Sequence, residues 1–167
     1  MTTDYESQRD WAFQTQLVRG ATERSQFMET SEAIYMTSGY TYKTAEEAEQ
    51  SFNGERERFV YSRFRNPTVA MFELRLALLE GAEECRAMAS GMAAVFASLA
   101  CQLSAGDRLV ASRALFGSCS YICGELLPRF GIVTEFVDGA DLAQWKKALA
   151  KPTQAVFVET PSNPGLE

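Results

Sequence analysis

The sequence predicts an α/β protein in which residues 66–167 form a mainly parallel sheet with helices on both faces, preceded by an N-terminal arm, residues 1–65. Two observations support this. Helical and strand-like patterns alternate regularly after residue 66, which is typical of β-α-β units. Before residue 66 the chain is polar and irregular, with scattered aromatic residues, so it does not predict a domain of its own.

The arm contains one predicted helix. Thr44 is followed three residues later by Glu47, which is the capping-box pattern of a helix start, and the helix is expected to end at Gly54. The stretch FMETSEAIYMTSGYTY, residues 27–42, is irregular yet apolar. We expect this stretch to be extended and to lie on a neighbouring subunit.

The second region predicts four helices and four strands. In order, these are a helix from Pro67 to Gly81, a strand at 84–89, a helix at 90–103, a strand at 108–112, a helix at 117–127, a strand at 132–137, a helix at 141–150 and a strand at 154–159. Pro67 suits a first helical turn, Pro128 is expected to stop the third helix, and Asp141 is expected to cap the fourth. Right-handed crossovers are expected, and ligands of such sheets bind beyond the carboxyl ends of the strands. The segments after the first, second and fourth strands should therefore meet on one rim.

The composition argues against several classes of function. The chain carries a net charge of −6, which disfavours binding to nucleic acid or to a membrane surface. It has no apolar run long enough to cross a membrane, and its first residues are polar and acidic, unlike a signal peptide. A cytoplasmic location is therefore expected.

The chain has no histidine, which excludes Ser-His, Cys-His and His-metal mechanisms within it. Its four cysteines form no C-x-x-C pattern, and two thiols one helical turn apart, Cys119 and Cys123, rarely make a zinc site without further ligands. We predict no metal site. The cysteines are expected to be small buried residues.

Ser90, Gly91 and Met92 open a helix directly after a predicted strand. Free N–H groups and the helix dipole at such a start suit a phosphate, and Gly91 lets a ligand approach the backbone. An ordinary serine cap on a buried helix explains the same residues. The chain has neither G-x-G-x-x-G after a strand nor G-x-x-x-x-G-K-[ST], which argues against dinucleotide and nucleoside-triphosphate ligands.

Two further candidates lie on the predicted rim. The ring of Phe116 could stack on a planar heterocycle, or it could belong to the core. The amide of Asn163, in a loop stiffened by prolines, could bind a ligand oxygen, or Asn before Pro could simply start a turn.

Tyr61 and Arg63 precede the helix start at Asn66 and Pro67. Arginine suits bidentate contact with a phosphate, and a tyrosine hydroxyl adds a second donor. A solvated arginine beside a packed tyrosine is the alternative, and Arg65 is a less favoured candidate in the same loop. The lysines follow no strand end and are expected at the surface: Lys43, Lys146, Lys147 and Lys151.

Three motifs together carry a family resemblance: YSR..NPT at residues 61–68, SGMAA at 90–94 and ETPSNP at 159–164. In this order they resemble the Cys/Met-metabolism (trans-sulfuration) family of pyridoxal-phosphate-dependent enzymes. That family includes cystathionine γ-synthases, cystathionine lyases, methionine γ-lyases and homoserine-ester sulfhydrylases. The resemblance runs from Leu17 to Glu167, and residues 17–42 and RALFGSC at 113–119 look most like the O-succinylhomoserine sulfhydrylases.

The resemblance implies the N-terminal portion of the large domain of a fold-type-I transferase, with pyridoxal 5'-phosphate as cofactor. It implies that Ser90, Gly91 and Met92 hold the cofactor phosphate, that Phe116 stacks on the pyridine ring, and that Asn163 contacts the phenolic oxygen while Glu159 supports the loop. Many family members have tyrosine where this chain has Phe116, so a proton-relay role of that hydroxyl is lost here. Tyr61 and Arg63 would reach the phosphate of a partner subunit's cofactor, in a homo-oligomer that is a dimer of dimers.

The family's pyridinium-binding aspartate and Schiff-base lysine are expected beyond Glu167, so no catalytic residue is assigned within this chain. The resemblance implies that the complete protein converts O-succinylhomoserine and sulfide to homocysteine and succinate, a step of methionine biosynthesis. An O-acetylhomoserine sulfhydrylase, a cystathionine γ-synthase or a methionine γ-lyase is the alternative within the family. A non-catalytic fragment or assembly module is the alternative from another class.

Overall fold

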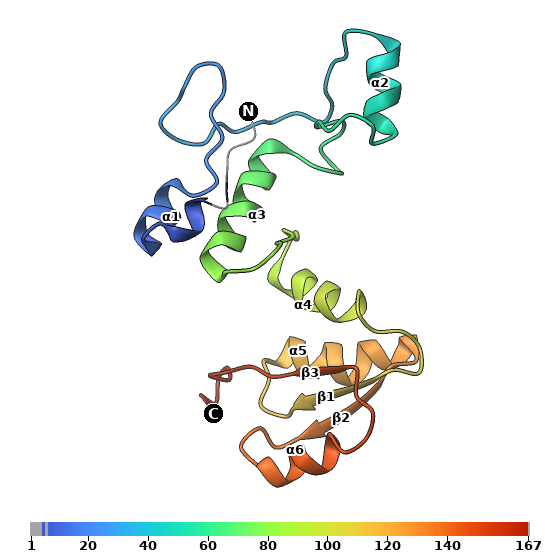
Figure 1. The fold of residues 1–167 in the computed structure, drawn as a ribbon. Helices are drawn as coiled ribbons and strands as arrows, with labels where there is room; N and C mark the ends of the chain where they lie inside the picture. Colours follow the sequence, from blue (N-terminus) through green and yellow to red (C-terminus); the bar gives the residue numbers. More distant parts are fainter. Residues whose placement is uncertain (1–4, 6, 167) are drawn as a thin grey trace. The chain divides into compact units, whose positions relative to one another are not determined.

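The computed structural model describes residue 5 and residues 7–166, and the chain divides into two compact units, 1–87 and 88–167 (Figure 1). We describe each unit by itself. The predicted end of the arm at residue 65 concerns the intact protein and stays a prediction.

The first unit is helical and loop-rich. Its elements are the 3-10 helix η1 (Ser7–Asp10) and the α-helices α1 (Phe13–Arg19), α2 (Ala45–Phe52) and α3 (Pro67–Glu80). The sequence did not predict η1 and α1. It did predict α2 and α3: Thr44 Oγ1 accepts the Glu47 N–H at 3.1 Å, and α3 ends at Gly81 with φ +62°.

Arg75, on α3, holds the chain that leaves α1. Its Nε donates to the carbonyl of Gly20 at 2.7 Å and its Nη2 donates to Thr22 Oγ1 at 2.9 Å. The same guanidinium forms an ion pair with Glu32. One partly buried arginine therefore fixes a segment that has no regular secondary structure of its own.

The predicted strand at 84–89 does not form, and this is a correction. Residues 84–89 belong to no strand, and the N–H of Ala87 instead donates to the carboxylate of Glu73 on α3 at 2.8 Å. A strand needs a neighbour to take up its N–H and C=O groups. Within the described residues, the sheet has three strands and pairs with none of this segment.

The second unit is a three-layer α/β arrangement. Its elements are α4 (Gly91–Ala100), β1 (Arg108–Ser112), α5 (Gly117–Tyr121), a π-helical turn η2 (Ile122–Leu126), a 3-10 turn η3 (Leu127–Phe130), β2 (Val133–Val137), α6 (Leu142–Ala148) and β3 (Ala155–Phe157). The strands are all parallel, in the order β2-β1-β3.

Alternate residues of β1 face opposite layers. Leu109 and Ala111 belong to the core cluster shared with α4 and α5, whereas Val110 packs with Val137, Ala148 and Trp145 on the α6 side. Figure 1 shows α5 and α6 on opposite faces of the strands. The prediction of a parallel sheet with helices on both faces is confirmed.

The third predicted helix continues past Pro128, which corrects the expected stop. After α5 the chain forms the π-helical turn η2, at whose end the Leu127 N–H donates to the Ile122 carbonyl. It then forms the narrower 3-10 turn η3. Pro128 lies in the first turn of η3, where a missing N–H costs no hydrogen bond. Gly131, at φ +78°, ends the helical run instead.

Within the described residues, no helix is both long enough and apolar enough to span a membrane.

Candidate functional site

The start of α4 offers free donors. Ser90 Oγ accepts the Ala93 N–H at 3.2 Å, which confirms the serine cap. The N–H groups of Gly91 and Met92 precede the first intrahelical hydrogen bond, so they remain available to a ligand. A Cβ built on Gly91 would meet nothing within 4 Å, and open space therefore lies beside these donors.

A single carboxylate joins the two loops that follow β1 and β3. Glu159 Oε2 accepts the N–H of Phe116 at 2.8 Å, and Glu159 Oε1 accepts the N–H of Asn163 at 2.8 Å. Both loops leave the carboxyl ends of neighbouring parallel strands. The structure thus brings together Phe116, Glu159 and Asn163, on the rim where the sequence predicted them.

Phe116 is not a core residue. Its side chain is 44% exposed, although Leu115 beside it is buried in the core cluster. Asn163 is exposed as well. An exposed ring and an exposed amide on one rim suit the stacking and hydrogen-bonding functions that the sequence suggested for them.

Cys119, in the first turn of α5, lies close to this carboxylate. Burial, and to a lesser degree the negative charge of Glu159, raise the pKa of its thiol. The thiol is therefore held neutral rather than primed as a nucleophile. The prediction of buried cysteines is right for Cys119 and Cys123 and wrong for Cys101, which is exposed, while Cys85 is only partly buried.

Ser90, Gly91 and Met92 reach this region through packing rather than through a preceding strand. Met92 packs against the same core cluster that contains Cys119. Among the described residues, no recorded hydrogen bond joins these three residues to the Glu159 carboxylate. The common rim is thus established for Phe116, Glu159 and Asn163, whereas the predicted strand that was to deliver Ser90 is absent from the described residues.

Tyr61 and Arg63 belong to the first unit. The guanidinium carbon of Arg63 lies 4.7 Å from the ring centre of Phe64 and 5.3 Å from that of Tyr61. The guanidinium thus lies over two rings that are inclined at 72° to each other, and these cation–π contacts orient the cation. Tyr61 is 39% exposed, so both side chains are accessible in this unit.

Three residues that we had not singled out hold the loop of Tyr61 and Arg63 in place. Ser62 donates to the Thr37 carbonyl, Asn66 Nδ2 donates to the Tyr35 carbonyl at 2.9 Å, and Thr68 Oγ1 accepts the Tyr35 N–H at 2.9 Å. The motif YSR..NPT therefore both presents Arg63 and clamps the extended segment. Its polar residues at 62, 66 and 68 were the signal in the sequence.

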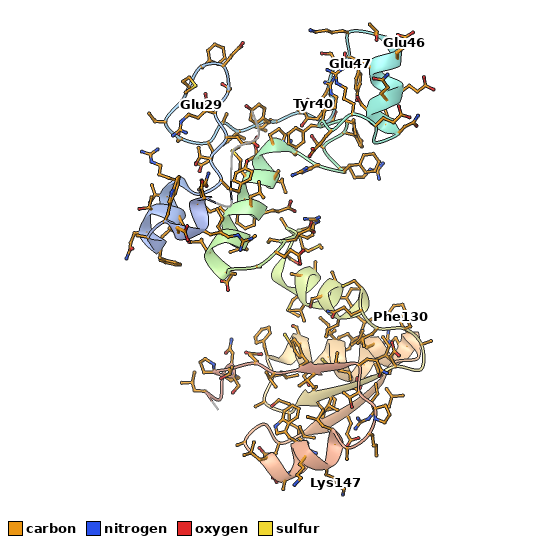
Figure 2. All side chains as sticks on the ribbon, in the orientation of Figure 1. Glu29, Tyr40, Glu46, Glu47, Phe130 and Lys147 are labelled. Carbon is orange, nitrogen blue, oxygen red and sulfur yellow. The ribbon has the colours of Figure 1, made fainter. Side chains whose placement is uncertain are left out.

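Lys43 belongs to the first unit, and among the described residues of the second unit no recorded contact joins Lys146, Lys147 or Lys151 to the rim of Phe116, Glu159 and Asn163. All four are exposed: Lys43, Lys146, Lys147 and Lys151. Figure 2 shows Lys147 on α6, in the layer on the far side of the sheet from α5. Among the residues described, no cluster of three acidic, cysteine or histidine side chains could hold a metal ion.

These observations fit a planar heterocycle that carries a dianionic group. Backbone donors and open space at Gly91 suit the anion, and the ring of Phe116 suits the heterocycle. Asn163 provides a neutral donor for a ring oxygen.

A family model described as "Cys/Met metabolism PLP-dependent enzyme" matches residues 14–167. The chain belongs to this family. Its cofactor is the one that the sequence predicted, pyridoxal 5'-phosphate. The resemblance read from the three motifs is confirmed.

Similar curated proteins point to one branch of the family. The chain is 63% identical over 147 residues to the O-succinylhomoserine sulfhydrylase of Mycobacterium tuberculosis, which covers 88% of this chain and 36% of that protein. It is 44% identical over 156 residues to the enzyme of the same name from Pseudomonas aeruginosa, which covers 93% of this chain and 39% of that protein. The chain thus spans little more than a third of the length of these relatives.

Solved structures agree on the fold. A protein described as an O-acetylhomoserine (thiol)-lyase of Campylobacter jejuni, solved with N'-pyridoxyl-lysine-5'-monophosphate, superposes with a TM-score of 0.86 at 31% identity, covering 95% of this chain and 39% of that one. A cystathionine γ-lyase of Lactobacillus plantarum superposes with a TM-score of 0.79 at 33% identity, covering 94% of this chain and 39% of that one. The fold-type-I assignment is confirmed.

Proposed function

We propose that the complete protein is a pyridoxal-phosphate-dependent sulfhydrylase that replaces the succinyloxy group of O-succinylhomoserine with sulfide, giving homocysteine and succinate. The observation that carries this proposal is the 63% identity to an O-succinylhomoserine sulfhydrylase across 88% of the chain. The reaction fits a step of methionine biosynthesis in the cytoplasm.

Within this chain, each site residue has a binding role. The N–H groups of Gly91 and Met92 hold the phosphate, and Ser90 keeps them in place by capping α4. Phe116 covers one face of the pyridine ring and Asn163 binds its phenolic oxygen. When bound, the cofactor would supply an electron sink for negative charge at the substrate Cα and then Cβ.

Phe116 has no hydroxyl and therefore cannot relay a proton at this position. Its ring excludes water from one face of the cofactor, and proton transfer falls to groups outside this rim. We assign the Schiff base to none of the four lysines of the chain, all of which are exposed, so we predict that residues 1–167 alone do not turn over substrate. Homocysteine formation above the rate with free cofactor would contradict this, if no second polypeptide is present.

Tyr61 and Arg63 serve a neighbouring subunit in this proposal. The guanidinium of Arg63, oriented by its cation–π contacts with Tyr61 and Phe64, carries donors suited to a phosphate, and Tyr61 adds a hydroxyl. The active site is then shared across the interface of a homodimer, and two such dimers form the tetramer.

The reaction is tested by steady-state kinetics of the complete protein on O-succinylhomoserine and O-acetylhomoserine, each with sulfide, with cysteine and with neither. A higher kcat/KM for the succinyl ester with sulfide supports the proposal. A preference for the acetyl ester, for cysteine as the thiol, or for elimination without a thiol identifies one of the other activities of the family.

One observation favours a second candidate, a γ-lyase. The chain is 38% identical over 134 residues to an L-methionine gamma-lyase of Fusobacterium nucleatum, covering 80% of the chain and 34% of that protein. Release of 2-oxobutyrate from methionine without added sulfide distinguishes this activity. A chain that acts only as an assembly module would show none of these activities, and a second polypeptide would copurify with it.

A further inference from the structure

The Glu159 carboxylate is hydrogen-bonded to both loops of the rim. Each of its oxygens accepts one backbone N–H: Oε2 that of Phe116 and Oε1 that of Asn163, both at 2.8 Å. The two loops follow different strands, and 43 residues separate Glu159 from Phe116 along the chain.

We propose that Glu159 is a positioning residue for the cofactor: its carboxylate sets the spacing between the ring of Phe116 and the amide of Asn163. This proposal rests on the proposed function, because it takes Phe116 to cover a face of the bound pyridine ring and Asn163 to bind the oxygen at its edge. Glu159 itself does not need to touch the cofactor in order to act.

The geometry makes this bridge specific to a carboxylate. A glutamine can accept only one of the two N–H groups, because its second terminal atom is itself a donor. An aspartate keeps both acceptor atoms, but its side chain is one methylene shorter. Hydrogen bonds to a charged acceptor are stronger than those between neutral groups, so losing one should release one loop rather than shift it slightly.

The surroundings also favour a fixed carboxylate. Glu159 is partly buried, and the N–H of Phe116 that it accepts lies at the start of α5, where the helix dipole favours negative charge. The neighbouring Cys119 thiol is buried and remains neutral, so no thiolate repels the Glu159 carboxylate.

Glu73 offers a matched control in the other unit. Its carboxylate is also partly buried and also accepts a backbone N–H, that of Ala87, at 2.8 Å. Glu73→Gln therefore makes the same chemical change to the same kind of bond, without touching either rim loop.

The experiment uses the complete, cofactor-loaded enzyme as wild type, Glu159→Gln, Glu159→Asp and Glu73→Gln. Pyridoxal-phosphate retention is measured by absorbance, and ring orientation by circular dichroism in the cofactor band at saturating cofactor. We expect Glu159→Gln to retain cofactor about tenfold less well and to change the dichroism, with Glu159→Asp intermediate and Glu73→Gln like wild type. Dichroism reports the orientation of the ring, so a purely structural loss of stability would not alter it at saturation.

Wild-type retention and dichroism in Glu159→Gln would overturn the proposal, as would an equal loss in Glu73→Gln. If Glu159→Gln does not fold, hydrogen exchange of the wild-type apoenzyme decides: fast exchange in the peptides that contain Phe116 and Asn163 would show that no bridge exists. Failure of the wild type to bind pyridoxal phosphate at all would instead refute the proposed function.

Discussion

Replacing glycine by alanine at Gly91 and at Gly139 should separate effects on cofactor binding from effects on folding. A Cβ on Gly91 would meet nothing within 4 Å, whereas a Cβ on Gly139 would lie 2.6 Å from Ser112 Oγ. Both glycines are in the second unit, but only Gly91 belongs to the proposed phosphate site. Gly→Ala at the two positions should therefore have opposite effects.

Gly91→Ala should leave the fold intact and weaken cofactor binding. Gly91 is the first residue of α4, and alanine is favoured over glycine by up to about 1 kcal/mol in helices, so the apoprotein should be as stable as wild type or slightly more stable. The added methyl group occupies the space beside the N–H donors of the helix start. We expect cofactor binding to weaken at least about tenfold, or about 1.4 kcal/mol.

Gly139→Ala should destabilise the second unit and leave the affinity for cofactor within about twofold of wild type. Ser112 is buried and its Oγ accepts the Ala114 N–H at 3.1 Å, so the hydroxyl can avoid the new methyl only by giving up this bond. The cost should be about 1–3 kcal/mol. Ser112→Ala removes the clashing atom and leaves the next contact at 3.5 Å, so in that background Gly139→Ala should cost little.

The assay combines urea unfolding of the complete apoprotein, hydrogen exchange in peptides covering β1, and titration with pyridoxal phosphate. Gly117→Ala controls for stability, because Gly117 is also a first helical residue with nothing within 4 Å of its Cβ position. Unchanged cofactor binding in Gly91→Ala would refute the phosphate site at α4. An equal cost of Gly139→Ala with and without Ser112→Ala would refute the steric argument.

Three further predictions follow from other contacts. Arg63→Ala should weaken cofactor retention about tenfold with little effect on the free energy of unfolding. Mixing this variant with one that lacks the Schiff-base lysine should restore activity if the site is shared between subunits. An unchanged dissociation constant for the cofactor would make Arg63 a surface residue. Asn66→Ala should lower the free energy of unfolding in urea by about 2–3 kcal/mol, because it removes both the cap of α3 and the donor to the Tyr35 carbonyl. Asn66→Asp keeps the cap and removes only the donor, so it should cost less. Equal costs for the two variants would show that the cap contributes nothing. Burial raises the pKa of the Cys123 thiol from 9.0 to about 11, so as the pH rises the unfolded chain loses this proton before the folded protein does. The free energy of unfolding should therefore fall between about pH 9 and 11. Cys123→Ala should flatten that fall, and identical pH profiles of wild type and Cys123→Ala would contradict the prediction.

The sequence was most informative where local chemistry decides the structure. The cap at Thr44, the helix from Pro67 to Gly81 and the cap at Asp141 were all predicted correctly, because capping depends on a few adjacent residues. The alternation of patterns likewise predicted β1, β2 and β3 and the two-sided sheet. The same local reasoning failed for residues 84–89, since a strand requires a partner that is not local.

The site divides in the same way. Gly91, Phe116 and Asn163 could be selected from motifs, but each also had an ordinary structural explanation that the sequence could not exclude. The grouping of Phe116 and Asn163 depends on Glu159, whose two oxygens accept the N–H groups of both residues. No sequence pattern states which backbone groups a carboxylate will accept.

The sequence by itself determined the family, the cofactor and the parallel α/β class, because ordered motifs and periodic patterns are properties of the chain. Only the tertiary structure showed that Phe116 is exposed, that one carboxylate bridges two loops, and that Asn66 clamps the extended segment. These features depend on contacts between residues far apart in the chain. The Glu159 bridge forms only once β1 and β3 are paired and the loops that they carry are held at a common edge.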